Sequence, residues 1–405
     1  MAVLYQIFIY VFGALTNIYA LFNKKIRVMV CGRKQTWNIL KTKIHNKDKV
    51  LWVHCASLGE FEQGRVLMEL FKQEQSDWKI LLSFYSPSGY EVRKNYECAD
   101  CVVYLPNDTK RNAKRFIDLA NPKIAVFIKY EFWYNYISFL RGIKVFQVSL
   151  IVRENHYLWR WYSGWFRQRL EVFTHFFIQD ATTARFMNYF GLKNYTITGD
   201  TRFDRVFQIA EKAIHIPVIE QWCNEKVLML GSSWEADEQL LKDSNLTEKM
   251  KVIIVPHNID DAHLDFLKGL FPHSLLYSDF TQSNISNTNV IIINTIGLLS
   301  SLYRYCYCAY VGGGFGKGIH NVLEAACFGK PVCFGTNYKK FNEAVYLVEN
   351  NGARVITSAK DLNIFVNDMF DKAKYEKASE ICSNYVMGNK GASRKIMNWI
   401  KVSEL

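Results

Sequence analysis

The feature that most constrains the fold is a regular alternation of short apolar runs with stretches of helical composition. A first series of runs occupies residues 51–56, 78–85, 101–106, 123–128, 145–151, 176–180 and 195–199, and a second occupies 226–233, 251–257, 290–294, 307–314 and 331–335. Continuous apolar strands separated by helices predict parallel sheets covered on both faces. In a chain of 405 residues, two series predict two doubly wound α/β domains in tandem.

The strand pattern pauses around Ile216-Pro217, which separates the two series. We therefore expect an N-terminal Rossmann-like domain over residues 50–205, a linker over 206–224 and a C-terminal Rossmann-like domain over 225–384. Residues 385–405 are predicted to form a helix that ties the two domains together.

Residues 1–23 carry no charged side chain, whereas residues 24–49 contain nine Lys or Arg and a single acid, Asp48. About 20 apolar residues suffice to cross a bilayer, and an excess of Lys and Arg after such a segment indicates the cytoplasmic side. Residues 1–23 are therefore expected to be a membrane anchor, either a span or a deeply inserted helix, with 24–49 as a basic juxtamembrane segment. A buried N-terminal helix is the alternative. The start lacks the basic region and cleavage site of a signal peptide.

The chain is basic overall, with a formal net charge of +12 and a pI near 9.1, which favours anionic partners. Because the excess lies beside the apolar segment, a membrane surface or a phosphorylated substrate is favoured over nucleic acid. The aromatic and basic stretch 156–173 suits either an interfacial helix or a core helix with solvated arginines. The ten cysteines are expected to be free thiols in a cytoplasmic location, and Cys98-x-x-Cys101 lacks a second pair for zinc.

The segment SLGEFEQG at residues 57–64 places an acid, Glu60, where a predicted strand gives way to a predicted helix. Ser57-x-x-Glu60 fits a capping box, in which the carboxylate accepts a backbone N–H and its pKa is expected to fall. Alternatively, the end of a parallel strand is where open α/β sheets bind ligands. The two interpretations are compatible.

The glycine-rich segment VGGGFGKG at 311–318 runs into His320-Asn321, where we expect a helix to begin. Glycines allow backbone N–H groups to approach a phosphate, and a helix start adds a favourable dipole. Glu324, one turn later, could accept the hydroxyls of a ribose. This predicts a nucleotide or sugar-phosphate site, although glycines also serve close packing. No D-x-D motif is present, so no metal is expected, and leaving-group charge would be met by N–H groups and cationic side chains.

Several ordered motifs together resemble the 3-deoxy-D-manno-octulosonic acid (Kdo) transferases of lipopolysaccharide synthesis, over almost the whole chain. The motifs are Ser57-x-Gly-Glu60, Pro87-x-Gly89, Tyr104-Leu-Pro106, Glu131-x-Trp133, Gly199-x-x-Arg202-Phe-Asp204, Val311-Gly-Gly and His320-Asn-x-Leu-Glu324. The resemblance implies a GT-B fold with two Rossmann-like domains facing a cleft. It also implies CMP-Kdo as donor, a lipid A precursor as acceptor, inversion at the transferred carbon, no cofactor, and work at the cytoplasmic face of the inner membrane.

The resemblance also implies roles for individual residues. Glu60 matches the general base, and Glu131 and Arg202 match residues that stabilise the transition state. The CMP site maps to Pro256, His257, Ile296, Gly297, Leu298, Gly313, His320, Asn321, Val322, Leu323 and Glu324. Three positions depart from the family pattern, because Leu298 stands where an acid is common, His257 where Arg is common and Lys129 where Glu is common.

Two other classes of function compete with a transferase. A nucleotide-sugar epimerase or hydrolase could use the same fold, because a fold does not fix a reaction. A non-catalytic protein that binds nucleotide at a membrane surface would leave Glu60 as a cap only. An epimerase has no need of the apolar and basic segments at 1–49.

Overall fold

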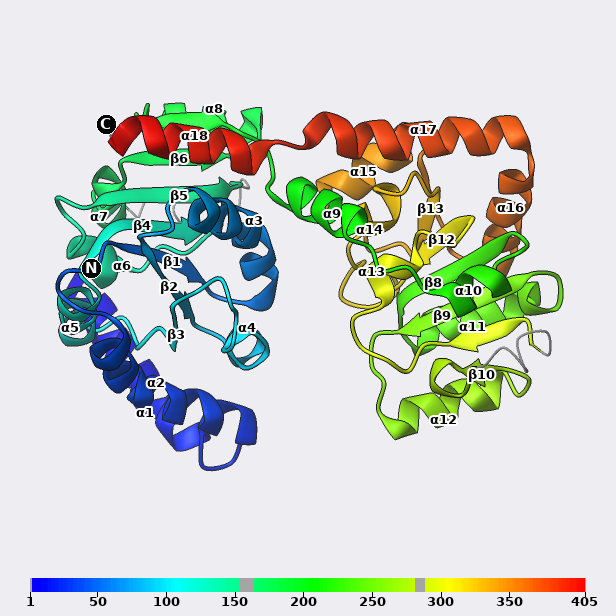
Figure 1. Cartoon of the computed structure of the whole chain (residues 1–405), viewed down its shortest axis with the longest axis horizontal. Helices are drawn as coiled ribbons and strands as arrows, with labels where there is room; N and C mark the ends of the chain where they lie inside the picture. The colour runs from blue at the N-terminus through cyan, green and yellow to red at the C-terminus, as the bar shows by residue number, and fades with distance from the viewer. Residues whose placement is uncertain (1, 153–163, 281–287, 405) are drawn as a thin grey trace. The chain divides into compact units, whose positions relative to one another are not determined.

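The computed structural model describes residues 2–152, 164–280 and 288–404 (Figure 1). The chain divides into two compact units, unit 1 comprising Met1–Arg205 with Lys390–Leu405 and unit 2 comprising Val206–Asn389. Each unit contains one seven-stranded sheet in which every neighbouring pair of strands is parallel.

In unit 1 the strand order is β3-β2-β1-β4-β5-β6-β7, so the order reverses between β1 and β4. The strands are β1 (Val50–Cys55), β2 (Lys79–Phe84), β3 (Cys101–Tyr104), β4 (Pro122–Ile128), β5 (Lys144–Leu150), β6 (His175–Ile178) and β7 (Tyr195–Ile197). The helices are α1 (Ala2–Tyr19), α2 (Lys24–Lys43), α3 (Leu58–Glu74), α4 (Pro87–Arg93), α5 (Lys110–Ala120), α6 (Tyr134–Ser138), α7 (Gly164–Arg167), η3 (Leu170–Val172), α8 (Ala181–Tyr189) and α18 (Ala392–Glu404).

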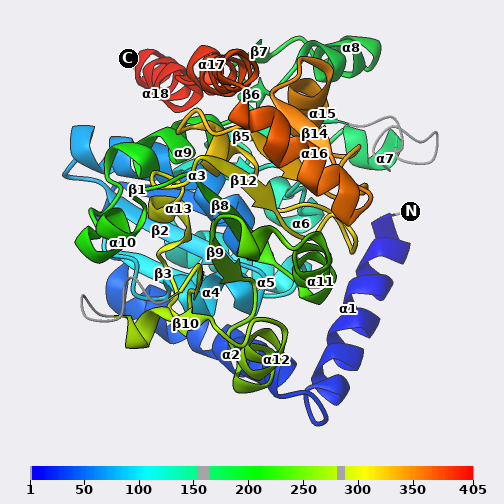
Figure 2. The same cartoon turned by 90° about the vertical axis from the view of Figure 1, so that its right-hand side faces the viewer.

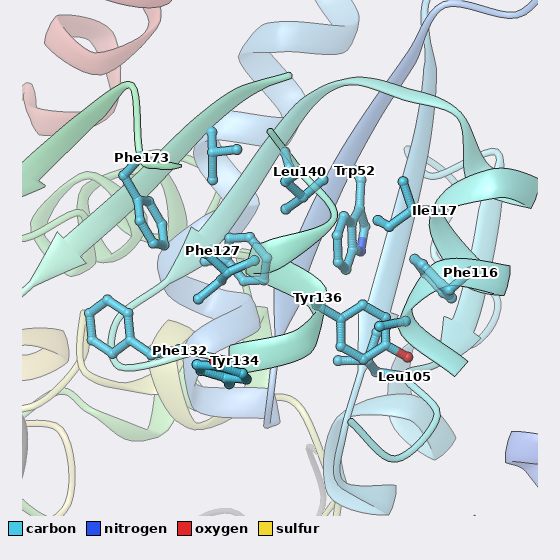
Figure 3. Packing of buried hydrophobic residues seen from close by; sticks show 14 of the residues in the cluster. Trp52, Leu105, Phe116, Ile117, Phe127, Phe132, Tyr134, Tyr136, Leu140 and Phe173 are labelled. Atoms are coloured by element: carbon cyan, nitrogen blue, oxygen red, sulfur yellow. The ribbon is translucent and has the colours of Figure 1, made fainter. Parts of the chain in front are cut away.

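The sheet of unit 1 separates two hydrophobic clusters, because successive side chains of a strand point to opposite faces. On one face Trp52 packs against Phe116, Phe127 and Tyr136, with ring centroids 4.9, 5.2 and 5.9 Å away (Figure 3). On the other face, the alternate residues of β1 join a cluster with Phe61 of α3 and with α18. All six residues of β1 are buried, and all but His54 are apolar, as expected for a strand covered on both faces.

Residues 385–405, expected as one helix, comprise the end of α17 (Lys372–Asn389) and the separate helix α18. Gly391, with φ of 101°, lies at the break. Asp204 accepts hydrogen bonds from the backbone N–H groups of Gly391 and Ser393. The chain thus returns to unit 1, where Ile396, Met397 and Ile400 are buried in the second cluster.

In unit 2 the strand order is β10-β11-β9-β8-β12-β13-β14, with the reversal between β8 and β12. The strands are β8 (Val227–Ser233), β9 (Lys251–Pro256), β10 (Leu275–Leu276), β11 (Val290–Ile292), β12 (Cys308–Val311), β13 (Val332–Phe334) and β14 (Ala353–Val355). The helices are α9 (Arg202–Glu211, which begins in unit 1), α10 (Pro217–Trp222), α11 (Glu235–Ser244), η4 (Leu246–Glu248), α12 (Asp261–Leu270), η5 (Tyr277–Asp279), α13 (Leu299–Leu302), α14 (Leu323–Ala326), α15 (Asn342–Glu349), α16 (Ala359–Phe370) and α17.

Each apolar run in the two series corresponds to a strand, and the prediction of a doubly wound α/β fold is confirmed. The short strands β10 and β14 were not predicted. The expected linker 206–224 is largely helical, because it contains most of α9 and all of α10. Residues 156–163 of the aromatic and basic stretch lie outside the described residues, and the remainder of the stretch contains α7 and η3.

Candidate active site

Glu60 lies in the first turn of α3, directly after β1. Its carboxylate accepts a hydrogen bond from the backbone N–H of Ser57 at 3.0 Å, so it satisfies one of the N–H groups at the helix start. The side chain is partly buried. The predicted capping interaction of the carboxylate is therefore present.

Glu131 follows β4, the neighbour of β1 at the reversal of strand order. The chain leaves β4 through Lys129, whose φ of 68° is unusual for a residue with a side chain and turns the backbone sharply. The Glu131 carboxylate lies 2.7 Å from the indole Nε1 of Trp133 and 3.2 Å from Nε2 of His54. Two donors thus hold this carboxylate at the end of the sheet.

His54 was not among the predicted site residues, although it is the one imidazole in the apolar run 51–56. Its side chain is fully buried. Nδ1 lies 3.1 Å from the carbonyl oxygen of Ser83 and 2.9 Å from the Ser83 hydroxyl, and Nε2, which faces Glu131, lies 3.0 Å from the Trp133 indole nitrogen. The imidazole thereby links β1, β2 and the turn that carries Glu131.

The pKa of Glu60 is raised above its ordinary value, mainly because burial disfavours the charged form and next because of the negative charge of Glu131. The lowered pKa expected from the capping box is wrong. Nearby His54 and the capping N–H groups of Ser57 and Ala56 oppose the increase but do not outweigh it. A carboxylate with a raised pKa accepts a proton more readily, which is what a general base requires.

Arg202, at the start of α9, is held by Asp200. Its Nε donates to one Asp200 oxygen at 2.7 Å and its backbone N–H to the other at 2.9 Å. The amide of Gln63, on the same helix as Glu60, donates to Asp200 at 3.4 Å. Asp200 and Gln63 are both buried. This chain of contacts connects the end of β7 to α3, and neither Asp200 nor Gln63 was assigned a role from the sequence.

In unit 2 a pocket of about 280 Å³ opens at the carboxyl ends of β9 and β11. Of the predicted donor residues, Pro256, His257, Ile296 and Gly297 line it, whereas Leu298 does not and its neighbour Leu299 does. Ile296 is 85% exposed, and Gly297 has a φ of 96° that a side chain would disfavour.

The glycine loop is tightly folded on itself. The Gly313 N–H donates to the buried carboxylate of Asp237 at 2.9 Å, and the N–H groups of Gly316 and Gly318 donate to the Gly313 carbonyl oxygen. At Gly314 an added Cβ would lie 2.5 Å from the backbone of Gly335. Three N–H groups expected to face a phosphate thus have partners within unit 2, and Gly314 permits close packing.

The segment after the loop differs from its predicted form. The helix expected from His320 is the four-residue α14, which begins at Leu323, and Val322 precedes it. Asn321 accepts from the N–H of Leu323 at 3.2 Å and donates to Glu324 at 3.0 Å. Ser300 donates to the other Glu324 oxygen. These bonds fix the orientation of the Glu324 carboxylate, while the short helix supplies little dipole.

Three aromatic rings stack beside the loop. Trp234 lies 4.6 Å from His257, and His257 lies 4.5 Å from His320, between ring centroids. The indole Nε1 of Trp234 donates to Nε2 of His320 at 3.0 Å. Burial, and then the neighbouring His257, lower the pKa of His320 to about 4. Burial also lowers the pKa of His257. Both imidazoles are therefore neutral at pH 7, and the proton of His320 is on Nδ1.

A cation near the glycine loop comes from Lys340, which was not predicted. Its Nζ lies beside Gly318, only 2.7 Å from where an added Cβ would stand. The same ammonium group donates to the carbonyl oxygen of Lys317. Among the described residues, no group of three or more His, Cys, Asp and Glu side chains could hold a metal ion.

The candidate site residues of unit 1 and those of unit 2 occupy equivalent places in their sheets. Open parallel sheets bind ligands beyond the carboxyl ends of their strands, at the point where strand order reverses. Glu60 and Glu131 follow β1 and β4 at the reversal in unit 1, and Trp234 and Gly313 follow β8 and β12 at the reversal in unit 2.

Comparison with protein families identifies residues 32–205 as matching the model described as 3-deoxy-D-manno-octulosonic-acid transferase (kdotransferase). A curated relative, the 3-deoxy-D-manno-octulosonic acid transferase of Aquifex aeolicus, is 27% identical over 324 residues, covering 77% of this chain and 83% of the relative.

Solved structures show the same architecture at low sequence identity. A putative UDP-N-acetylglucosamine 2-epimerase from Listeria monocytogenes superposes with a TM-score of 0.62 at 13% identity, covering 87% of this chain and 96% of that one. The calicheamicin glycosyltransferase CalG4 superposes with a TM-score of 0.53 at 11% identity, covering 88% and 98%. The fold is thus of the GT-B type, and because an epimerase and a glycosyltransferase share it, the fold leaves the reaction open.

Proposed function

Because the chain belongs to the 3-deoxy-D-manno-octulosonic acid (Kdo) transferase family, and is therefore a glycosyltransferase, we propose that it transfers Kdo from CMP-Kdo to a sugar hydroxyl of a lipid A precursor. The observation that carries this proposal is the pair Glu60 and Glu131 at the strand reversal of unit 1, with the pKa of Glu60 raised. A sugar hydroxyl is a weak nucleophile, and a positioned carboxylate that takes up its proton supports its attack.

In the proposed reaction Glu60 accepts the proton of the acceptor hydroxyl while that oxygen forms a bond to the ketosidic carbon of Kdo. The bond from this carbon to the phosphate oxygen of CMP breaks, and CMP leaves with the electron pair. Attack opposite the leaving group inverts the configuration. Glu131, held by Trp133 and His54, and Arg202, held by Asp200, are proposed to stabilise the transition state.

We propose that CMP binds in unit 2. The pocket at Pro256, His257, Ile296 and Gly297 is of a size that suits a pyrimidine base. Glu324, oriented by Asn321 and Ser300, is proposed to accept the ribose hydroxyls. Neutral His320 can donate one hydrogen bond from Nδ1, and Lys340 supplies positive charge near the phosphate.

We also propose that the chain works at the cytoplasmic face of the inner membrane. Helix α1 is long and apolar enough to cross a membrane, and only 6% of it is buried. The basic residues of α2 follow it directly. A membrane location would bring the enzyme to a lipid acceptor.

The test incubates the purified full chain with CMP-Kdo and a tetraacyl disaccharide acceptor and follows the product mass. A new product heavier by one or more Kdo units is expected. No product, under conditions in which a known transferase works, would refute the proposal. Interconversion of free nucleotide sugars with no acceptor product would instead favour an epimerase.

The base assignment has its own test. Glu60→Gln is expected to lower kcat by about 10² to 10⁴-fold, because the amide cannot accept the proton. Its side-chain oxygen can still accept from Ser57, so the far-UV circular dichroism should be unchanged. Glu69→Gln, on the same helix, is the matched control and should retain the wild-type rate. A folded Glu60→Gln variant with full activity would exclude Glu60 as the base.

A further inference from the structure

The N-terminal helix α1 contacts other elements of unit 1 along its length. Near its start, the Tyr5 hydroxyl donates to Asp108 at 2.6 Å and the Gln6 amide donates to Asn135 at 2.6 Å. In its middle, Gly13 is buried and an added Cβ would lie 2.9 Å from the amide nitrogen of Asn107. At its end, Arg27 of α2 donates to the carbonyl oxygen of Ala20 at 3.0 Å.

The contacts near Tyr5 attach α1 to α6 through a buried carboxylate and two aromatic rings. Asp108 is 1% exposed, and it also accepts from the backbone N–H groups of Asn135 and Tyr136 at 3.1 Å each, at the start of α6. The ring of Tyr5 lies 5.4 Å from that of Tyr134 and 5.9 Å from that of Trp165. One buried carboxylate thus joins α1 to α6, a few residues after Glu131.

This geometry conflicts with a helix that spans a bilayer. Tyr5 precedes Tyr19 by 14 residues, which at 1.5 Å per residue places it about 21 Å along the helix axis. In a spanning helix that leaves the membrane near Tyr19, Tyr5 would lie deep in a hydrocarbon layer about 30 Å thick. Here Tyr5 and Gln6 instead contact the same unit that the chain enters at α2.

The rest of the helix surface is apolar and exposed. Leu4, Ile7, Phe8, Val11, Leu15 and Ile18 are between 52% and 62% exposed. Figure 2 shows α1 in profile, a straight helix that turns into α2 at its lower end. That turn carries Leu21 and Phe22, 67% and 81% exposed, followed at once by Lys24 and Lys25. Neither α1 nor α2 contains an acidic residue.

From these contacts we infer that α1 is an in-plane membrane helix. It stays docked on unit 1 and buries its outer face in a single leaflet of an anionic bilayer, with the basic residues of α2 at the headgroups. An apolar helical face of this kind enters the boundary between headgroups and acyl chains without crossing it. The inference rests on the proposed membrane function and specifies its geometry. The N-terminus then lies on the same side of the membrane as the two units.

The decisive experiment compares two epitope tags on the full-length chain in sealed inner-membrane vesicles, one tag before Met1 and the other after Leu405. Vesicles with unit 1 facing outward are treated with a protease, with and without detergent. Loss of both tags at similar rates without detergent is expected. An N-terminal tag that is cut only after detergent, while the C-terminal tag is lost at once, would overturn the inference.

A second experiment tests the lipid-facing surface by co-flotation with vesicles of phosphatidylethanolamine and phosphatidylglycerol. Ile7→Glu with Val11→Glu should reduce binding more than tenfold, because each places a charge in hydrocarbon. The control is Ile364→Glu on α16, where the side chain is 45% exposed, and it should bind as the wild type does.

Replacing Lys24 and Lys25 with Gln should weaken binding to these vesicles by about fivefold per residue, and much less for phosphatidylcholine vesicles. Unchanged flotation of the Ile7→Glu, Val11→Glu variant would contradict the inference, as would a dimer that buries this face and shows no lipid binding. The protease and flotation experiments do not use CMP-Kdo, so their results are independent of the activity test. A chain that binds vesicles but transfers no Kdo would refute the proposed enzymatic function and leave the membrane inference standing.

Discussion

At Glu60 a helix-capping bond and a raised pKa occur together, because the same turn that offers an N–H from Ser57 also removes the carboxylate from water. The neighbouring carboxylate of Glu131 adds repulsion. Like charges held close together raise the pKa of at least one of them. The reactivity proposed for Glu60 therefore depends on Glu131 as well as on burial.

The first residue-scale prediction concerns pH. If Glu60 is the base, kcat/KM should rise with pH as Glu60 loses its proton. Removing the neighbouring charge with Glu131→Gln should lower the Glu60 pKa and move this acidic limb to lower pH, even though the overall rate falls. The measurement is a pH profile of the residual activity. A limb that stays in place or moves to higher pH would contradict the coupling, and Glu69→Gln serves as the unshifted control.

A second prediction concerns Trp234, whose indole N–H holds the proton of His320 on Nδ1. Trp234→Phe keeps an aromatic ring against His257 but cannot donate this bond. Losing one such hydrogen bond, at about 0.5–1.5 kcal/mol, should weaken CMP affinity about twofold to tenfold. Isothermal titration with CMP measures it. Trp37→Phe, in unit 1, should bind CMP normally, and equal affinities for all three proteins would show that the tautomer is irrelevant.

Hydrogen bonds between single residues were predictable where both partners lie within one short motif. The bond between Ser57 and Glu60 follows from their spacing, as does the bond between Asn321 and Glu324. The direction of the Glu60 pKa was not predictable, because it depends on burial and on Glu131, 71 positions away. His54 and Lys340 were missed because their partners, Glu131 and Lys317, are distant in sequence. Asp200 was missed although its partner Arg202 lies only two residues away.

At the scale of elements, long buried strands were the most predictable part of the fold. β1 and β9 are almost entirely buried and appear in the sequence as largely apolar runs, with His54 and Lys251 as their polar members. β14 has three half-buried residues, and β10 has only two residues, so neither leaves such a run. The start of α14 was misplaced because a loop, rather than a helix, presents His320 and Asn321.

Helix α18 provides a test at this scale. Ile396 is fully buried in the second cluster of unit 1, and Ile396→Ala should lower the free energy of unfolding of unit 1 by about 2–5 kcal/mol. Val402→Ala, on the same helix with the side chain 75% exposed, should change it by less than about 0.5 kcal/mol. Urea denaturation followed by circular dichroism measures both. Similar effects of the two substitutions would indicate that α18 is not docked as described.

At the scale of the whole molecule, the chain passes from unit 1 to unit 2 after Arg205 and returns after Asn389. Unit 2 is thus an insertion in sequence, although it has its own sheet and hydrophobic cluster. The two series of apolar runs in the sequence predicted two sheets. Residues 385–405 were expected to form a helix that ties the two domains together, but this expectation did not specify the return to unit 1, because a single amphipathic helix does not specify the sheet against which it packs.

The division into two units predicts which backbone segments bound CMP protects. Hydrogen exchange with saturating CMP should slow at the backbone around residues 256–258, 295–299 and 319–324, all in unit 2, because a bound ligand stabilises the state that binds it. At a ligand concentration of 100 times Kd the stabilisation is about 2.7 kcal/mol. Protection confined to α1, α3 or α5 would contradict the assignment of the donor site to unit 2.

The return of α18 to unit 1 has a consequence during protein synthesis. The apolar surface that Ile396, Met397 and Ile400 cover belongs to elements of unit 1 that precede unit 2 in the sequence, among them α3. Domains generally fold as units from the N-terminus, but unit 1 lacks part of its core until α18 has been made. Through that interval the nascent chain carries an uncovered apolar face while α1 is already available to lipid. A truncation that removes only the final helix would therefore leave the first-made unit open to aggregation.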